Sequence, residues 1–247
     1  MHYYSRNRTD LNGESVTEAW TLTEASFLKL EEASLLLLRI RDRERTEGAH
    51  PVFLTDRLIV EGLLFSGLRN TEFCSLALGN TVVGRKQSVF VVAGTPKQDR
   101  TVHVPEFVSD LVKRYAKDVR PELLREEFSP DDPAVPLLIN ERGRPYERTA
   151  LYRRVLRILA DVGFGARASV QLLRHTYGFL AYKQTGGNLL FVQQQLGHAH
   201  PMVTAIYADF VPFPPEELAA TTAAMFQPAA ENAPKRRRRA TRRTTGE

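Results

Sequence analysis

Residues 171 to 210 read QLLRHTYGFLAYKQTGGNLLFVQQQLGHAHPMVTAIYADF, a sequence of helical character that carries Arg174, His198 and Tyr207 at fixed intervals. Arginine can hold phosphate oxygens through two parallel hydrogen bonds, and histidine exchanges a proton near neutral pH. Tyrosine can act as a nucleophile that forms a covalent intermediate. The three residue types together suit phosphate-ester chemistry without a metal ion. Each also has a structural interpretation: Arg174 as a buried structural arginine, His198 as a helix cap and Tyr207 as a core aromatic.

The bulk composition is that of a globular protein. At 247 residues and 43% hydrophobic content, the chain can form one large domain or one domain with appendages. No run approaches 18 apolar residues, so no membrane span is expected. The N-terminal sequence MHYYSRNRTDLNGES lacks the apolar region of a signal peptide. The single cysteine, Cys74, excludes an internal disulfide and a cysteine-based zinc site, and is predicted to be a small buried residue. A soluble intracellular protein is expected.

The net charge of +5 is concentrated in the C-terminal tail. Residues 234–247 carry seven Lys/Arg and one Glu, a net +6, which leaves −1 for residues 1–233. Within residues 1–233, residues 151–210 are basic and residues 106–132 are acidic, which suits one side that faces a polyanion. The run KRRRRATRR at 235–243 cannot bury a core and is predicted to be disordered. It is interpreted as a nucleic-acid tether, with a localisation signal or a non-specific polycation tail as alternatives. Its predicted DNA-binding residues are Lys235, Arg236, Arg237, Arg238, Arg239, Arg242 and Arg243.

Hydrophobic periodicity predicts a mainly α fold with a small antiparallel sheet. Helices are expected over 21–45, 54–65, 70–76, 105–119, 149–159 and within 171–210. Three β-branched runs between residues 81 and 104, separated by turn signals, predict a three-stranded sheet. Lys97 is placed at or just past the second of these turns. In the first helix, Thr23 is a candidate N-cap. The apolar stripe expected there is Leu28, Leu30, Leu35, Leu38 and Ile40.

The predicted domain organisation has three parts. Residues 1–20 are polar and aperiodic, and are expected to form a flexible N-terminal segment. Residues 21–226 are expected to form one domain, and residues 227–247 a basic disordered tail. The domain is expected to end in a short helix at 216–226, which is marginal in isolation and needs a packing partner in the chain or in a neighbour.

Three sequence boxes occur in order: SGLRNTEFCSLAL at 66–78, QLLRHTYGFLAYKQTGG at 171–187 and LGHAHPMVTAIY at 196–207. They resemble the catalytic domain of the tyrosine recombinase (phage-integrase) family. That family carries a T/S-G-L-R-x-x-E-L box, an H-x-L-R-H-T box, an L-G-H box and a tyrosine nine residues after the last histidine. Tyr207 lies nine residues after His198. The resemblance covers residues 21–226, and it implies that family's catalytic-domain fold.

The resemblance implies a role for each matching residue. Arg69 and Arg174 hold the non-bridging oxygens of the scissile phosphate, and His198 hydrogen-bonds the phosphate. Tyr207 attacks phosphorus, and Lys97 protonates the leaving 5′ oxygen. The products are a 3′-phosphotyrosine link and a free 5′-hydroxyl. The 3′-phosphotyrosine link conserves the energy of the broken phosphodiester bond, so rejoining the DNA strand needs no ATP, no metal and no other cofactor.

Further residues of the boxes are expected to support or to modify this chemistry. Glu72 and His175 are predicted as supporting residues beside the two arginines. Gln171 stands where the family has the first histidine of its H-x-x-R box. Glutamine can hydrogen-bond a phosphate oxygen but exchanges no proton at neutral pH, so slower chemistry is expected. Many relatives carry a separate N-terminal domain that clamps the DNA. Only about twenty residues precede the first predicted helix here, which is too few for such a domain. The chain therefore resembles a catalytic domain alone, as in the short fimbrial invertases.

The resemblance implies a site-specific DNA recombinase of the integrase, invertase or resolvase type. Gln171 and the missing clamp domain motivate an alternative, a DNA-binding regulator or accessory protein without turnover. A weaker third possibility is a relaxing enzyme similar to type IB topoisomerases. Recombination of two duplexes needs an active site for each strand that is cut, so the resemblance implies a homotetramer on double-stranded DNA. The helix at 216–226 is the candidate element exchanged between neighbours, and the expected location is the cytoplasm, in association with the nucleoid.

Overall fold

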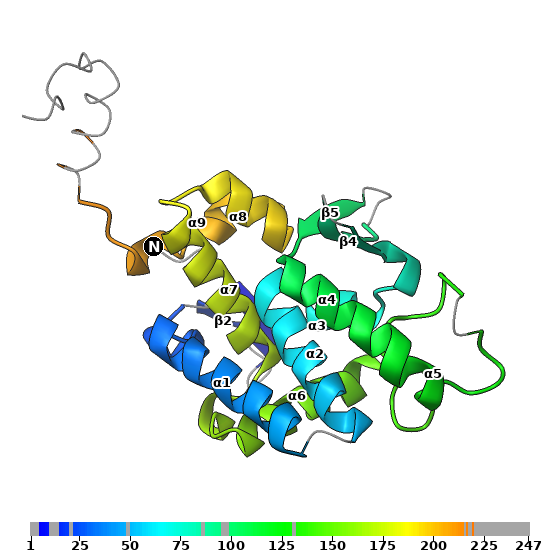
Figure 1. The fold of residues 1–247 in the computed structure, drawn as a ribbon. Coiled ribbons are helices and arrows are strands. Elements are labelled where there is room, and N and C mark those ends of the chain that lie inside the picture. Colours follow the sequence, from blue (N-terminus) through cyan, green and yellow to red (C-terminus); the bar gives the residue numbers. More distant parts are fainter. Residues whose placement is uncertain are drawn as a thin grey trace, which may run out of the picture. The chain divides into compact units, whose positions relative to one another are not determined.

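The structure is a computed structural model that describes a defined part of the chain. It describes residues 5–9, 15–19, 22–47, 50–84, 87–94, 99–129 and 132–214, with 216 and 219. The chain divides into two compact units, residues 1–212 and 213–247. The first unit is mainly helical and contains a three-stranded antiparallel sheet (Figure 1), which confirms the predicted fold class. The predicted helix at 216–226 and the basic run at 235–243 lie outside the described residues, apart from positions 216 and 219.

Helix α2 (Pro51–Ser66) is the central helix of the domain. It packs against α1 (Leu30–Glu47), α4 (Glu106–Arg114), α6 (Arg148–Asp161) and α7 (Val170–Gln184). Leu58, Ile59, Val60 and Leu63 are all fully buried on it. Leu58, Ile59 and Val60 are consecutive and therefore point to different sides of the helix, and their burial agrees with the four helices that surround α2. The helix predicted at 54–65 is confirmed and begins earlier, at Pro51, because proline is well suited to the first helical position.

The start of α1 differs from the prediction. The helix begins at Leu30 rather than Thr21, and a short 3-10 turn, η1 (Glu24–Ser26), precedes it. Thr23 caps that turn through a backbone N–H that donates to Ser26 Oγ at 3.1 Å. The chain then becomes extended at Phe27, whose ring stacks on Phe179 of α7 at 4.3 Å between centroids. Tertiary packing on α7 therefore overrides the local helical preference.

The apolar stripe predicted for this helix is confirmed at Leu28, which lies just before α1, and at Ile40, but not at its other three residues. Leu30, Leu35 and Leu38 are 49%, 40% and 65% exposed, whereas the buried face of the helix runs through Ala33, Leu36 and Ile40. Residues three and four apart share a helical face, but Leu30 and Leu35 are five apart and do not. The leucines of this helix therefore cover more than one face.

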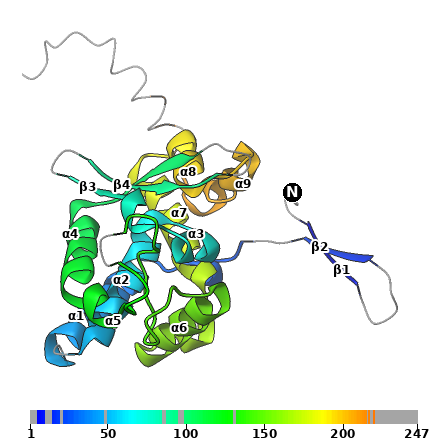
Figure 2. The ribbon, with the colours of Figure 1, turned by 90° about the vertical axis from the view of Figure 1, so that its right-hand side faces the viewer.

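The predicted sheet is confirmed. Strands β3 (Thr81–Val83), β4 (Ser88–Val92) and β5 (Arg100–His103) are antiparallel in the order β3-β4-β5. Phe90 pairs with Val102, and both are buried in the core. The sheet packs against α4, and β5 contacts α8 (Leu189–Leu196). Figure 2 shows the sheet, α8 and α9 (Pro201–Ala205) at one end of the domain and α6 at the other. Lys97 lies outside the described residues.

The segment after β5 is helical as predicted. Pro105 is the N-cap of α4, which continues into a π-helical turn at Tyr115–Val119 and then α5 (Arg120–Leu123). Leu111 and Tyr115 of this segment are buried, whereas Phe107 is 39% exposed. It makes an edge contact with Phe65 of α2 instead. The basic helix predicted at 149–159 is α6.

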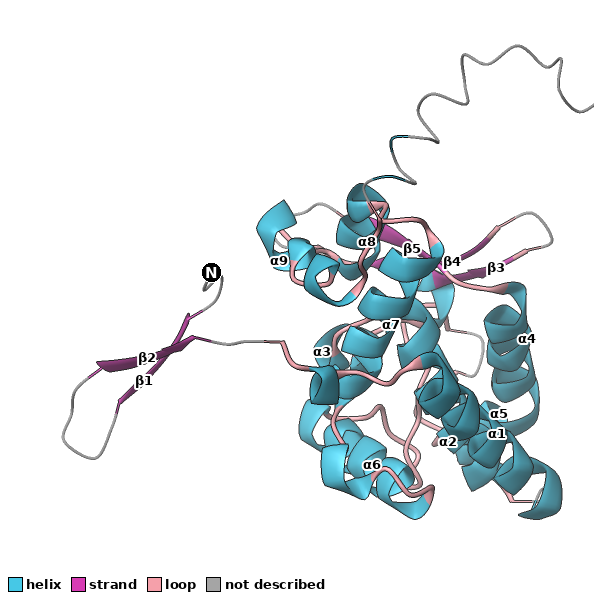
Figure 3. Cartoon of the chain, turned by 90° about the vertical axis from the view of Figure 1, so that its left-hand side faces the viewer, coloured by secondary structure: helices cyan, strands magenta, loops and turns pink. Residues whose placement is uncertain are grey.

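The stretch at 171–210 forms α7, α8 and α9, joined by short turns. Ser169 caps α7 by accepting the N–H of Leu172, and Asn188 caps α8 by accepting the N–H of Phe191. Gly197 ends α8 with a φ of 64°, a conformation that favours glycine. Figure 3 shows α7 within the domain, with α8 and α9 beyond one of its ends. Tyr207 follows α9 rather than lying inside a helix.

Near the N-terminus, β1 (Ser5–Thr9) pairs with β2 (Ser15–Ala19) in an antiparallel arrangement. Among the residues that the structure describes, no helix is both long enough and apolar enough to cross a membrane.

Candidate active site

The corner between α2 and α3 (Asn70–Cys74) positions Arg69. Gly67 ends α2 with a φ of 63°, and its N–H donates to the carbonyl of Leu63 at 3.0 Å. A side chain at Gly67 would collide with Tyr177 and Leu196, so the position requires glycine for its space as well as its φ. Arg69 then takes an extended conformation at the start of α3.

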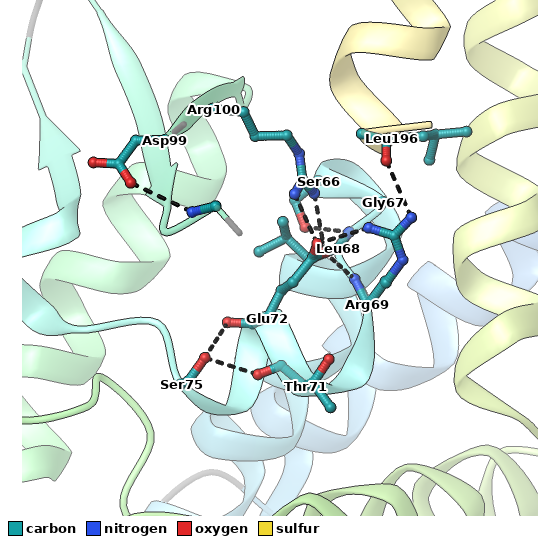
Figure 4. Close-up of polar contacts among 12 residues, drawn as sticks. Ser66, Gly67, Leu68, Arg69, Thr71, Glu72, Ser75, Asp99, Arg100 and Leu196 are labelled. Atoms are coloured by element: carbon teal, nitrogen blue, oxygen red, sulfur yellow. Dashed lines mark hydrogen bonds and ion pairs between the residues drawn. The ribbon is translucent and has the colours of Figure 1, made fainter. Parts of the chain in front are cut away.

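Glu72 lies between two arginines, Arg69 and Arg100 (Figure 4). Its Oε1 accepts from Nη1 of Arg69 at 2.8 Å and from Nη1 of Arg100 at 2.7 Å. Its Oε2 accepts from the backbone N–H of Arg69 at 2.7 Å and from Nη2 of Arg100 at 2.9 Å. Burial alone raises the pKa of this carboxyl group, but the hydrogen bonds from Arg100 and Arg69 lower it to about 2. Glu72 is therefore ionised at neutral pH.

Arg174 and Arg69 converge on the end of α8. Arg174 is 4% exposed, and its two Nη atoms donate to the carbonyls of Gly67 at 2.5 Å and Leu196 at 2.8 Å. Nη2 of Arg69 donates to the next carbonyl, that of Gly197, at 3.1 Å. These bonds use two of the five N–H groups of Arg174. Burial, together with the positive charge of Arg69, lowers the pKa of Arg174 to about 10, so it remains charged at neutral pH.

His198 follows directly in the same turn. Its Nδ1 lies 2.8 Å from Oγ1 of Thr204, a fully buried residue of α9 that orients the ring. Burial lowers the pKa of His198 to about 3, and the neighbouring positive charges, first that of Arg174, act in the same direction. The ring is therefore neutral at neutral pH and can donate or accept a hydrogen bond but carries no charge.

Tyr207 is fully buried beside α7. Its Oη lies 3.0 Å from Nδ1 of His175, and its ring packs directly on Gly178, where an added Cβ would lie 2.5 Å from Oη. Burial raises the pKa of Tyr207, although the charge of Arg174 opposes that shift. Burial, with the charge of Arg174, lowers the pKa of His175 to about 4. At neutral pH a protonated phenol therefore lies beside an uncharged imidazole.

The structure brings together most of the residues that the sequence singled out. Arg69, Arg174 and His198 meet around the turn that ends α8, and Arg174 acts electrostatically on both His198 and Tyr207. Gln171 is exposed in the first turn of α7, and no hydrogen bond of its side chain occurs within the described part of the chain. The roles assigned to Lys97 and to the seven basic tail residues concern positions outside the described residues.

The sequence did not identify Arg100, Thr204 or Gly178 as parts of the site. Arg100 contacts a carboxylate 28 positions earlier in the chain, and no local spacing connects the two. Thr204 and Gly178 lie inside the matched boxes, but each has its role only because of a packing partner, His198 and Tyr207 respectively. The one available signal was the position of Arg100, three residues after Lys97 on the same predicted hairpin.

Known proteins share both the sequence pattern and the fold. The model of the phage integrase family matches residues 29–211. The tyrosine recombinase XerC of Halalkalibacterium halodurans is 30% identical over 182 residues, which cover 74% of this chain and 57% of that protein. The tyrosine recombinase XerD of Vibrio vulnificus is 32% identical over 160 residues, which cover 64% of this chain and 49% of that protein. The chain thus spans about half the length of the curated relatives that it matches.

Solved structures with the same fold include two that contain DNA. One is the XerH site-specific recombinase bound to its difH substrate, with a TM-score of 0.64 and 24% identity over 89% of this chain and 60% of that one. Another is the Tn1549 transposon integrase in complex with transposon right-end DNA, with a TM-score of 0.63 and 17% identity. That match covers 83% of this chain and 68% of the integrase chain. At these identities the likeness concerns the fold. Taken with the family match over residues 29–211, it shows that the chain belongs to the phage integrase family, that of the tyrosine recombinases.

Proposed function

We propose that this chain cuts and rejoins DNA strands at specific sites through a 3′-phosphotyrosine at Tyr207, as an integrase, invertase or resolvase. The observation that carries the proposal is the convergence of Arg69, Arg174 and His198 on the turn that ends α8, with Tyr207 within electrostatic reach of Arg174. These residues come from three separate boxes, and packing of α2, α7 and α8 unites them. Such a set suits a phosphodiester, which gains negative charge when it is attacked.

The two arginines supply fixed positive charge for the phosphate. Both are held by carbonyl oxygens of the same turn, so their guanidinium groups are oriented before any ligand arrives. Preorganised donors of this kind stabilise a developing charge without reorganisation at the moment of reaction. His198, oriented by Thr204, adds a neutral hydrogen-bond donor. The family resemblance assigns protonation of the leaving 5′ oxygen to Lys97.

The nucleophile must lose its proton when the oxygen–phosphorus bond forms. Tyr207 is protonated at neutral pH, because burial raises its pKa. Nδ1 of His175 lies 3.0 Å from Oη and accepts that proton if the ring carries its hydrogen on Nε2. Gln171 cannot take this role, because an amide does not exchange a proton at neutral pH. Since Tyr207 is fully buried, a local movement must bring Oη and the phosphate together.

His175→Gln is expected to slow the formation of the covalent adduct by about 100-fold, at the low end of the range for general acid–base catalysis. Glutamine fills similar space and can hydrogen-bond Oη but cannot accept its proton. Single-turnover kinetics on a trapping substrate measure the effect.

Gln184→Ala is the matched control, since it removes an exposed polar side chain at the other end of α7, outside the candidate site. A His175→Gln variant as fast as wild type would remove the histidine from the proton transfer.

Double-stranded DNA is the proposed partner, in a homotetramer that assembles through the helix at 216–226. The basic run at 235–243 supplies charge for sequence-independent contact with phosphates, and this contact weakens as salt rises. Deleting residues 216–226 should leave a folded monomer that no longer assembles on DNA, as measured by light scattering. Assembly that survives the deletion would place the oligomer contact elsewhere.

A suicide-substrate trap tests the function directly. Duplexes from a randomised pool, each with a nick that lets the leaving 5′ fragment escape, are incubated with the chain, and covalent protein–DNA species are isolated. Adducts linked through Tyr207, identified by mass spectrometry, support a strand transferase. Sequence-specific binding without any adduct would favour the alternative, a DNA-binding regulator, and relaxation of plasmids without sequence preference would favour a topoisomerase-like enzyme.

A further inference from the structure

We propose that Arg100 is a positioning residue of this site, which acts through Glu72 to orient the guanidinium of Arg69 toward the bound phosphate. The inference rests on the proposed function, because it assumes that Arg69 holds a phosphate. Arg100 is the first residue of β5, and it lies outside the three boxes that define the family resemblance. It connects the sheet to the helical part of the site.

The contact between Arg100 and Glu72 has a defined geometry. Nη1 and Nη2 of Arg100 donate to Oε1 and Oε2 of Glu72 at 2.7 and 2.9 Å, a two-point contact that fixes the plane of the carboxylate. Each of these oxygens also accepts one bond from Arg69, either from Nη1 or from the backbone N–H. The carboxylate is therefore shared equally by both arginines (Figure 4).

Arg69 depends on this arrangement more than a buried residue would. Its side chain is 43% exposed, and the bonds that restrain its guanidinium go to Glu72 and to the carbonyl of Gly197. If Glu72 lost its support from the sheet, its side chain could rotate toward solvent and Arg69 would move with it. Arg174 is 4% exposed and is held by two backbone carbonyls, so it does not depend on Glu72.

Arg100 also supports the other restraint on Arg69. Its guanidinium packs against Gly197, where an added Cβ would lie 2.7 Å from Nε of Arg100. That Nε is buried, and within the described residues it has no hydrogen-bond partner. Gly197 provides the carbonyl that accepts from Arg69, and His198 follows it. One side chain thus contacts both groups that hold Arg69 in place.

The charge state of Glu72 gives a pH-dependent readout. The charged groups that act on it are Arg100 and Arg69, and they lower its pKa from 4.5 to about 2 although burial opposes the shift. A depressed carboxyl pKa contributes stability that is complete above the unfolded value and is lost as the pH falls from 4.5 to about 2. Without Arg100 the pKa of Glu72 moves back toward 4.5, so the stability lost over this interval is smaller.

An ordinary structural ion pair would behave differently, and the chain offers a matched one. Arg57 donates to Glu44 at 2.6 Å and to Glu61 at 2.9 Å, and its side chain is 21% exposed against 22% for Arg100. It joins α2 to α1. Arg57→Gln therefore removes a comparable pair from a different part of the domain.

The first test needs no DNA. Side-chain NMR of the full chain compares the Nε–Hε signal of Arg69 in wild type, Arg100→Gln and Arg57→Gln. The heteronuclear NOE of this signal is expected to fall in Arg100→Gln alone, and carboxyl titration is expected to show a raised pKa for Glu72 in that variant. An Arg69 signal that stays as ordered in Arg100→Gln as in wild type would overturn the proposal.

The second test measures reaction on the duplexes that trap wild type. Arg100→Gln is expected to slow adduct formation by about 10- to 100-fold, the cost of a misplaced group, with the affinity for DNA unchanged. Arg100→Lys should recover only part of the rate, because an ammonium cannot form the two-point contact. Equal rates in Arg100→Gln and Arg57→Gln would overturn the proposal. A wild type that forms no adduct would defeat the proposed function instead, and the NMR comparison would still decide whether Arg100 orders Arg69.

Discussion

Tyr207→Phe is expected to abolish the covalent protein–DNA adduct while the fold and the affinity for DNA are retained. Phenylalanine keeps the ring that packs on Gly178 and loses only Oη, the atom that attacks phosphorus. Gly178 packs on the ring and His175 contacts the hydroxyl, so the substitution keeps the packing and removes only the reacting atom. The variant also loses the bond to His175, which costs about 1 kcal/mol of stability. Trapping on a suicide duplex and thermal unfolding measure the two effects.

Tyr115→Phe is the control for that experiment. Tyr115 is likewise fully buried, and its hydroxyl accepts the N–H of Ile139 at 3.0 Å, away from the candidate site. Its loss is expected to lower stability by a similar amount and to leave adduct formation intact. An adduct that persists in Tyr207→Phe, linked through another residue, would show that the nucleophile has been misassigned.

Arg174→Lys is expected to lower the rate of adduct formation by about 100- to 1,000-fold, the effect of removing one preorganised donor from a charged transition state. The guanidinium reaches two carbonyls, of Gly67 and Leu196, and still has N–H groups for a phosphate. An ammonium is a single point charge and cannot span these partners. The substitution keeps the positive charge, so a large loss would identify geometry rather than charge as the requirement. Single-turnover kinetics at saturating DNA separate this loss from weaker binding.

Arg120→Lys is the corresponding control. Arg120 is also fully buried, and its Nη2 donates to the carbonyl of Pro136 at 3.3 Å. Both lysine variants are expected to lose stability, as shown by thermal unfolding, but only Arg174→Lys should react slowly in its folded state. Comparable rates for the two variants would argue against a phosphate contact by Arg174.

The elements that carry the site could be predicted because their signals are local. Glycines end α2 and α8, Ser169 and Asn188 cap α7 and α8, and β-branched runs form the sheet. Each of these helix ends, caps and strands depends on a few neighbouring residues, so a single sequence is sufficient to predict it. The box residues were found in the same way, through their spacing along the chain.

The errors share a cause. The chain before α1 leaves the helical conformation because Phe27 stacks on Phe179, some 150 residues later in the sequence. Likewise, the buried face of α1 is the one that meets α2, and the leucines alone did not identify it. In both places, distant packing outweighed a local preference.

The sequence by itself determined the family resemblance, the helical fold class and the order of the arginines, the histidine and the tyrosine. Only the tertiary structure decided that Arg100 shares Glu72 with Arg69, that Tyr207 lies fully buried beside His175, and that His198 is uncharged. The physical reason is that these properties arise from desolvation and from contacts between side chains that lie 28 and 32 positions apart in the chain. Neither has a signature in the spacing of residues along the chain.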